Sequence, residues 1–271
     1  MGLSIFAPGF SGSLVAIAMG FYHEFVRIIA NPFKKFKQNM IFCAPLGVGL
    51  FFSAVLFILA FRQLFDSYEK AIYLLFVGLI AGSIPLVFLE VKKLGFKNYY
   101  LIGADGAFLL AVAIGIFASG SGLMSGDTAS MSDWPGIALG GLAAGVTALI
   151  PGMSLATILI LLGVYGPIIY AGEALLRMEF SYIIPVGLFL IFVAVGLMST
   201  AKGIKIVFEK YPGFSNTTVL GFQVGSLASI LYRSIQTVDS NFTWFFGIIM
   251  IAAGLGISGL FILMGRMMNK E

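Results

Sequence analysis

The residues best suited to chemistry lie in two short motifs that are near copies of each other. The first is Ala7-Pro8-Gly9-Phe10-Ser11-Gly12, and the second is Ile150-Pro151-Gly152-Met153-Ser154-Leu155, at a constant offset of 143 residues. In each motif a Pro-Gly pair interrupts an apolar run and a serine follows. Paired interruptions of this kind in the two halves of a chain are the best indication in a sequence of a transporter's binding site. We therefore place the candidate site at these two motifs.

The chemistry that the motifs predict is the binding of an anion such as a phosphate. A proline that ends one helical segment can serve as the first residue of the next, so each motif predicts a helix that begins at its proline. The free N–H groups of a helix N-terminus favour an anion, and nearby hydroxyls add donors. The alternative is that Pro-Gly only turns a helical hairpin and that the serines bond back to backbone carbonyls. The predicted phosphate-binding residues are Gly9, Ser11, Gly12, Ser13, Gly152, Ser154 and Thr157.

The elements that must position these residues are membrane helices. The chain has 271 residues, 59% of them hydrophobic and 10% charged, and a mean hydropathy of +1.03, which predicts an all-α polytopic membrane protein. Each half is read as a re-entrant helical hairpin followed by three transmembrane helices. Repeat one covers 1–119, with the hairpin at 1–30 and spans at about 41–61, 71–90 and 99–119; a polar linker covers 120–133; repeat two covers 134–271, with the hairpin at 134–171 and spans at about 182–200, 216–232 and 243–265.

The distribution of charge predicts the orientation of the two halves. If each hairpin returns to the side from which it enters, 12 of the 16 Lys and Arg residues fall on one side: Arg27, and those in the loops 31–40, 91–98 and 201–215 and near the C-terminus. Short cytoplasmic loops accumulate Lys and Arg, so this side is cytoplasmic and holds both termini. Three spans are an odd number, so the second repeat is inverted relative to the first. The first hairpin then enters from the cytoplasm and the second from outside.

Several titratable residues are candidates for binding a lipid headgroup or a coupling proton or cation. Asp105 lies inside a predicted span, where an ionisable group is a functional hypothesis, although it could equally cap or pair near the helix end. The others are read either as functional groups or as solvated and snorkelling charges at the membrane surface. The full set of headgroup or coupling candidates is Arg27, Asp105, His23, Glu24, Arg177 and Arg233.

Composition and spacing argue against other classes of function. Gly9-Phe10-Ser11-Gly12 matches the nucleophile motif of intramembrane serine proteases, but His23, the one histidine, lies about 18 Å from Ser11 if both belong to one helix. One histidine and acidic residues without ligand spacing predict no metal site, and no cofactor is expected. The one cysteine, Cys43, excludes an internal disulfide, and no signal peptide is evident. The distribution of the net charge of +4 indicates membrane topology rather than a nucleic-acid-binding surface.

The doubled motif, with Gly-x-Tyr following it in both copies, resembles the PopT-type polyprenyl-phosphate transporters of bacteria and archaea over nearly the whole chain. This sequence departs from the family pattern in three places. Ser13-Leu14 stand where Gly-Thr is common, His23 stands where an acidic residue often follows the tyrosine, and Leu155-Ala156 replace Gly-Ser. The resemblance implies a flippase that returns undecaprenyl phosphate, or a similar lipid carrier, to the cytoplasmic leaflet of a prokaryotic inner membrane for envelope biogenesis. The implied partners are the lipid and the bilayer, with a coupling proton or cation and the oligomeric state left open. A transporter or channel for a small soluble anion is the alternative, which the scarcity of polar residues in the spans disfavours; Gln223 is a rare exception.

Overall fold

The structure is a computed structural model of the chain. It describes residues 8–9, 11–13, 16, 19–30, 34–121, 133–237 and 242–268, without the side chains of 61–66, 118–121 and 264–268. The first hairpin before Pro8 and most of the predicted linker, residues 122–132, therefore lie outside the described residues. Everything below refers to the described part of the chain.

The described residues form helices joined by short turns and contain no strand, so the predicted all-α class is confirmed. Five segments are long and apolar enough to cross a membrane: Phe36–Ala60, Ser67–Lys93, Tyr100–Phe117, Phe180–Lys210 and Trp244–Leu263. The chain is thus a multi-pass membrane protein. The helices are α3 (Tyr22–Ala30), α4 (Phe36–Lys93), α5 (Tyr100–Ser121), α6 (Trp134–Leu149), α7 (Leu155–Leu161), α8 (Tyr165–Leu176), the 3-10 helix η2 (Phe180–Tyr182), α9 (Ile183–Lys210), α10 (Pro212–Gln236) and α11 (Trp244–Met268).

Two segments that the sequence suggested as loops are helical. The charged stretch 62–70 lies within α4, which is interrupted by one residue, Tyr68, with the non-helical angles φ −144° and ψ 47°. The basic stretch after residue 200 continues α9 to Lys210, and α10 begins at Pro212. Lys, Arg and Glu are good helix formers, so charge by itself does not end a helix. The break between α9 and α10 falls at Tyr211, which precedes Pro212, because proline disfavours helical geometry in the residue before it.

Helix α10 differs from the other long helices in its polarity. It has 25 residues, about 37 Å, which is enough to span the hydrocarbon, but it is too polar to be counted among the five apolar segments. Its buried hydroxyls bond largely to carbonyls one turn earlier, as Ser226 does to Phe222 at 2.7 Å. These bonds satisfy the polar groups inside the bundle. Whether α10 counts as the sixth span of an inverted repeat stays a prediction.

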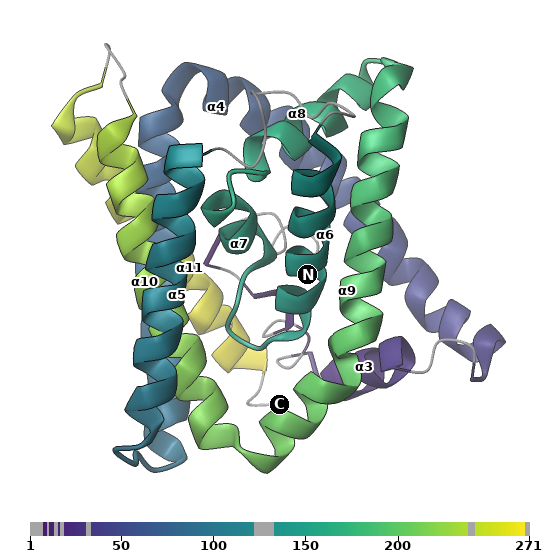
Figure 1. The fold of residues 1–271 in the computed structure, drawn as a ribbon, viewed down its shortest axis with the longest axis vertical. Helices are drawn as coiled ribbons and strands as arrows, with labels where there is room; N and C mark the ends of the chain where they lie inside the picture. Colours follow the sequence, from purple (N-terminus) through teal and green to yellow (C-terminus); the bar gives the residue numbers. More distant parts are fainter. Residues whose placement is uncertain are drawn as a thin grey trace.

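The helices pack in pairs whose contacts recur between the two halves. Helix α5 packs on α10, α4 on α11, and α6 on α9 (Figure 1). A Cβ atom on Gly82 in α4 would lie 2.6 Å from Ser258 Cβ in α11, and one on Gly225 in α10 would lie 2.6 Å from the Phe108 carbonyl oxygen in α5. Gly82 and Gly225 are related by the repeat offset of 143. Gly82 and Gly225 therefore each allow two membrane helices to approach closely.

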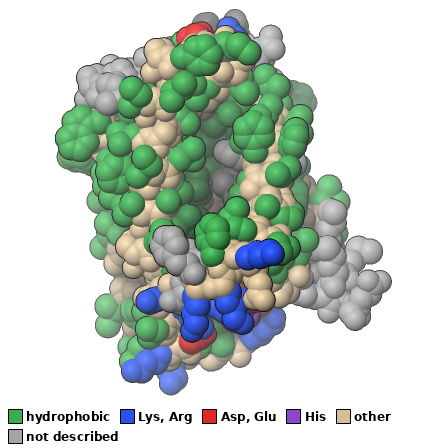
Figure 2. All heavy atoms as spheres, turned by 90° about the vertical axis from the view of Figure 1, so that its right-hand side faces the viewer, with side chains coloured by type: hydrophobic (Ala, Val, Ile, Leu, Met, Phe, Trp, Pro, Cys, Tyr) green, Lys and Arg blue, Asp and Glu red, His purple; other side chains and the backbone are tan. Residues whose placement is uncertain are grey.

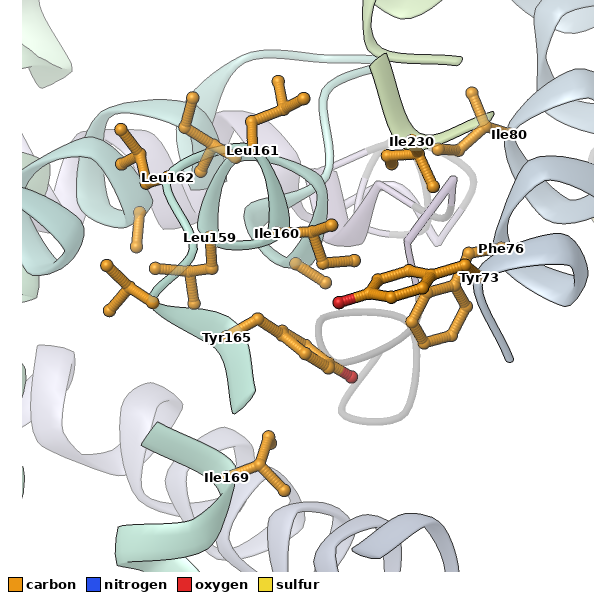
Figure 3. Packing of buried hydrophobic residues seen from close by; sticks show 14 of the residues in the cluster. Tyr73, Phe76, Ile80, Leu159, Ile160, Leu161, Leu162, Tyr165, Ile169 and Ile230 are labelled. Carbon is orange, nitrogen blue, oxygen red and sulfur yellow. The ribbon is translucent and has the colours of Figure 1, made fainter. Parts of the chain in front are cut away.

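The short helix α7 lies in the centre of the molecule. Its residues from Ala156 to Leu161 are all buried, and Figure 3 shows Ile160 beside Tyr73 of α4 and Ile230 of α10, and Leu159 beside Tyr165 of α8. Tyr165, at the start of α8, contacts Phe76 of α4 edge to face, with the ring centroids 6.0 Å apart. This apolar cluster holds the segment that follows the second motif in a fixed place.

Most of the Lys and Arg side chains gather at one end of the molecule. The start of α4, the connection from α4 to α5 and the corner between α9 and α10 lie toward the lower end in Figure 1, and Figure 2 shows Lys and Arg side chains collected there. Helix α6 starts from the opposite end, whereas α3 lies at the lower end. This placement agrees with a cytoplasmic lower end by the positive-inside rule.

Two single cysteines should therefore label from opposite sides of the membrane. In a Cys43→Ala background, Lys97→Cys lies in the connection between α4 and α5, and Met178→Cys lies in the exposed turn after α8. An impermeant maleimide should modify the cysteine at 178 in intact cells and the one at 97 only after the membrane is opened. Labelling of both cysteines in intact cells would contradict this topology.

Candidate functional site

Both Pro-Gly motifs form tight turns that require glycine. Gly9 has φ +85° and Gly152 has φ +89°, in the left-handed region that other residues avoid. Each turn is also pressed against a helix: a Cβ on Gly9 would lie 2.6 Å from the carbonyl carbon of Leu79 in α4, and one on Gly152 would lie 3.0 Å from Val219 in α10. The two turns are thus buried inside the bundle.

The two turns touch, and a chain of hydrogen bonds joins them. The Gly152 N–H donates to Ser11 Oγ at 3.2 Å, Ser11 and Ser13 are joined through their Oγ atoms at 2.6 Å, and Ser13 Oγ donates to the Ile150 carbonyl at 3.1 Å. A hydroxyl has one proton, so Ser13, which uses its proton at Ile150, must accept from Ser11. The circuit leaves the second motif at Gly152 and returns to it at Ile150. We call these groups the turn junction.

Side chains from elsewhere complete the turn junction. The last carbonyls of a helix have no partner within it, and at the end of α6 the Leu149 carbonyl accepts a 2.8 Å hydrogen bond from the Tyr22 hydroxyl. Gln223 of α10 donates through Nε2 to the Gly152 carbonyl at 2.5 Å. Tyr22 of α3 therefore caps the end of α6, and Gln223 of α10 holds the turn that follows it.

The start of the second half-helix differs from the prediction. Helix α6 ends at Leu149, before an extended Ile150, as expected, but α7 begins at Leu155 and not at Pro151. Pro151 and Gly152 form a turn instead, because the left-handed geometry of Gly152 cannot belong to a right-handed helix. The Gly152 N–H consequently bonds to Ser11 rather than lying free at a helix end, and Ser154 and Thr157 are buried at the start of α7.

Each motif is followed by a second break that the motif itself does not predict. Gly20 has φ +78° and Gly163 has φ +72°, and α8 is bent by 112° from α7. The assumption that Ser11 and His23 share one helix is therefore wrong, since α3 starts afresh at Tyr22. His23 is exposed in α3 whereas Ser11 is buried with its hydroxyl in the turn junction. The signal was present in the Gly-x-Tyr that follows both motifs.

Most of the titratable candidates lie outside the turn junction. Arg27 and Glu24 form an exposed ion pair within α3, and Arg177, just after α8, pairs with Glu173 of that helix at 2.6 Å. Asp105 lies on the exposed face of α5. Exposed ion pairs contribute little to stability, so the positions of these charges say more about the membrane surface than about packing. Over the described residues, no cluster of three or more His, Cys, Asp or Glu side chains has the arrangement of a metal site.

Arg233 is the candidate cation that reaches the interior. Its Nη1 donates to the Ile160 carbonyl at 3.3 Å, near the end of α7, and its guanidinium lies 5.6 Å from the centroid of the Tyr73 ring. A cation is favourable at a helix C-terminus and over an aromatic face. Arg233 thus ties α7 to α10 and α4.

Replacing Arg233 with methionine should lower the free energy of unfolding by about 1–2 kcal/mol, because a hydrogen bond and a cation–π contact are both lost. Reversible unfolding in mixed micelles measures this change. Arg177→Met is the matched control, and it should change the same quantity by less than about 0.5 kcal/mol, since the Arg177 side chain is 70% exposed. Equal stabilities of the two variants would contradict the role given to Arg233.

The residue that sequence reasoning overlooked at the site is Gln223. It was noted only as a rare polar side chain in an apolar region, and its contact with Gly152 joins residues 71 positions apart. Gln223 lies in the predicted span 216–232, and a polar group inside a membrane span is a functional hypothesis in its own right, so this signal was available in the sequence. The partner of the amide was not, because it depends on how α10 packs against the second motif.

A family model described as "VCA0040-like: Undecaprenyl phosphate translocase-like" matches residues 1–241 of the chain. Neither a curated protein nor a solved structure matches it.

Proposed function

The chain belongs to the undecaprenyl phosphate translocase-like family, and we propose that it is a flippase that carries undecaprenyl phosphate, or a similar polyprenyl phosphate, across the cytoplasmic membrane of a prokaryote. Its role would be the recycling of the lipid carrier used in building the cell envelope. The observation that carries the proposal is the turn junction, a cluster of hydroxyl and N–H groups buried between apolar membrane helices.

The turn junction offers donors that a phosphate can recruit. The predicted site residues Gly9, Gly12, Ser154 and Thr157 lie in the same two motifs as Ser11, Ser13 and Gly152. The hydrogen bonds between the two turns are neutral, whereas bonds to an ionised phosphate are roughly twice as strong. A phosphate entering the junction would therefore take over the Gly152 N–H and the serine hydroxyls and separate the turns. The turn junction would then keep the two turns together in the empty protein and would separate when the phosphate binds.

The shape of the molecule favours a lipid over a soluble anion. Figure 2 shows a hollow in one face, between α9 and the first half of α4. Helix α9 packs on α6 and α3, and only 11% of the Phe36–Ala60 window is buried. An opening between two apolar spans faces the bilayer sideways. Such an opening suits a headgroup that moves through the protein while its isoprenoid chain stays in the membrane.

In this proposal the two motifs belong to inverted hairpins, entered from opposite leaflets, and both termini are cytoplasmic. Arg27 would attract the headgroup at the cytoplasmic end, and Arg177 at the outer end. Asp105, His23 and Glu24 remain candidates for a coupling proton or cation. Because these residues lie in α5 and α3, any such coupling would act at the periphery and not in the turn junction.

Reconstitution of the full chain into vesicles tests the proposal. Purified protein should accelerate the exchange of undecaprenyl phosphate between leaflets, measured by the fraction of lipid that an added phosphatase can reach. The same measurement with a pH gradient imposed and then removed reports whether protons drive the exchange. Uptake of inorganic phosphate into the vesicles without lipid exchange would instead identify a transporter of a small soluble anion.

A further inference from the structure

This inference rests on the proposed function and begins with the side chain of Gln223. The residue is 5% exposed, and its Nε2 donates to the Gly152 carbonyl at 2.5 Å. Its Oε1 is buried and has no hydrogen-bond partner within the described part of the chain. Reversing the amide would set two acceptor oxygens against each other, so the hydrogen-bond chemistry fixes its orientation. An open acceptor therefore lies beside the turn junction.

Packing against the turn at Gly152 does not by itself require an amide side chain at position 223. The equivalent position in the first repeat, 143 residues earlier, is Ile80. A Cβ on Gly9 would lie 2.7 Å from the Ile80 backbone nitrogen, so the first turn packs closely against this part of α4 beside an isoleucine. A buried acceptor without a donor is unfavourable. The difference between the two repeats therefore points to a ligand that supplies the donor.

We infer that Gln223 is a binding residue whose Oε1 accepts a hydrogen bond from the P–OH group of a singly protonated phosphate monoester. The N–H of Gly152 and the hydroxyls of Ser11 and Ser13 suit the ionised oxygens of the same headgroup, because these groups donate. One proton on the phosphate also reduces the charge that enters the apolar interior. A phosphodiester with the same single charge lacks the P–OH donor, so the site should discriminate against it.

Binding of two short probes to the purified full chain tests this inference. The probes are farnesyl phosphate and its methyl ester, and calorimetric titration in detergent near pH 5.5 keeps the monoester mostly singly charged, since its second ionisation has a pKa of about 6. The wild type should bind the monoester roughly tenfold more tightly than the methyl ester, as expected for one hydrogen bond to a charged group. In Gln223→Leu the ratio should fall to about one, because monoester binding weakens while methyl ester binding does not.

Asn216→Leu is the matched control, since this amide of α10 donates to the Pro212 carbonyl of its own helix at 2.8 Å, and the ratio should stay as in the wild type. Equal affinities of the wild type for the two esters would overturn the inference whether or not the variant folds. An equal loss of affinity for both esters in Gln223→Leu would also overturn the inference, because it would mean that Gln223 only holds the Gly152 carbonyl in place. If the wild type exchanges the lipid but binds the two esters equally well, the proposed function stands and only the inference about Gln223 fails. If the wild type neither exchanges the lipid nor binds either ester, the proposed function and the inference both fail.

Discussion

Replacing Ser11 with alanine should reduce polyprenyl-phosphate exchange at least about tenfold while the protein still inserts into the membrane. The serine oxygen accepts from Gly152 N–H and its hydroxyl bonds to Ser13, so alanine breaks the circuit at two bonds. Leaving a buried donor without an acceptor costs about 1–3 kcal/mol, and 1.4 kcal/mol corresponds to tenfold. The loss falls on the groups that the proposed function assigns to the phosphate. Leaflet exchange in vesicles, at matched protein content, measures it.

The control for this variant is Ser226→Ala. Ser226 is as buried as Ser11, but its hydroxyl donates to the Phe222 carbonyl of its own helix. We expect lipid exchange within about twofold of the wild type, because that carbonyl already takes part in the helix and loses little. Wild-type exchange by Ser11→Ala would show that the turn junction is not the phosphate site.

Replacing Gly9 with alanine should have the largest effect on folding of any single methyl group added to the motifs. The residue would adopt a left-handed conformation, which costs about 1–2 kcal/mol. Its Cβ would also lie 2.6 Å from the Leu79 carbonyl carbon and 2.7 Å from the Ile80 nitrogen, and both are backbone atoms that cannot turn aside. Overpacking of this kind adds about 1–3 kcal/mol. Reversible unfolding in mixed micelles should show the sum.

Gly20→Ala separates the two contributions to that loss. Gly20 has a similar φ of +78°, but a Cβ there would meet nothing within 4 Å. Its loss of stability should therefore be the conformational part alone, about 1–2 kcal/mol. If Gly9→Ala and Gly20→Ala proved equally stable, the first turn would not be pressed against α4 as the structure has it.

The sequence was least reliable where charge was used to end a helix. The charge of the stretches 62–70 and 201–215 predicts loops, but 62–70 is helical and 201–210 continues α9, since Lys, Arg and Glu favour helices. In the second stretch the helix breaks at Tyr211, before Pro212. Proline and glycine were better guides. The end of α6 before Pro151 was predicted within one residue, because the steric effect of proline on the preceding residue is local. The predicted start of α7 at Pro151 was wrong because Gly152 adopts a left-handed conformation, which delays the helix to Leu155.

Local sequence determined the membrane class, the helical content and the positions of the two Pro-Gly breaks, since hydrophobicity, proline and glycine act on the few residues around them. Only the tertiary structure decided what the breaks contact. Ser11 bonds to Gly152 over 141 residues of sequence, and Gln223 bonds to Gly152 over 71. A hydroxyl or amide has many possible partners in an isolated segment. The packing of α10 and the two turns inside one bundle brings these particular groups within hydrogen-bonding distance, and that packing is a property of the whole chain.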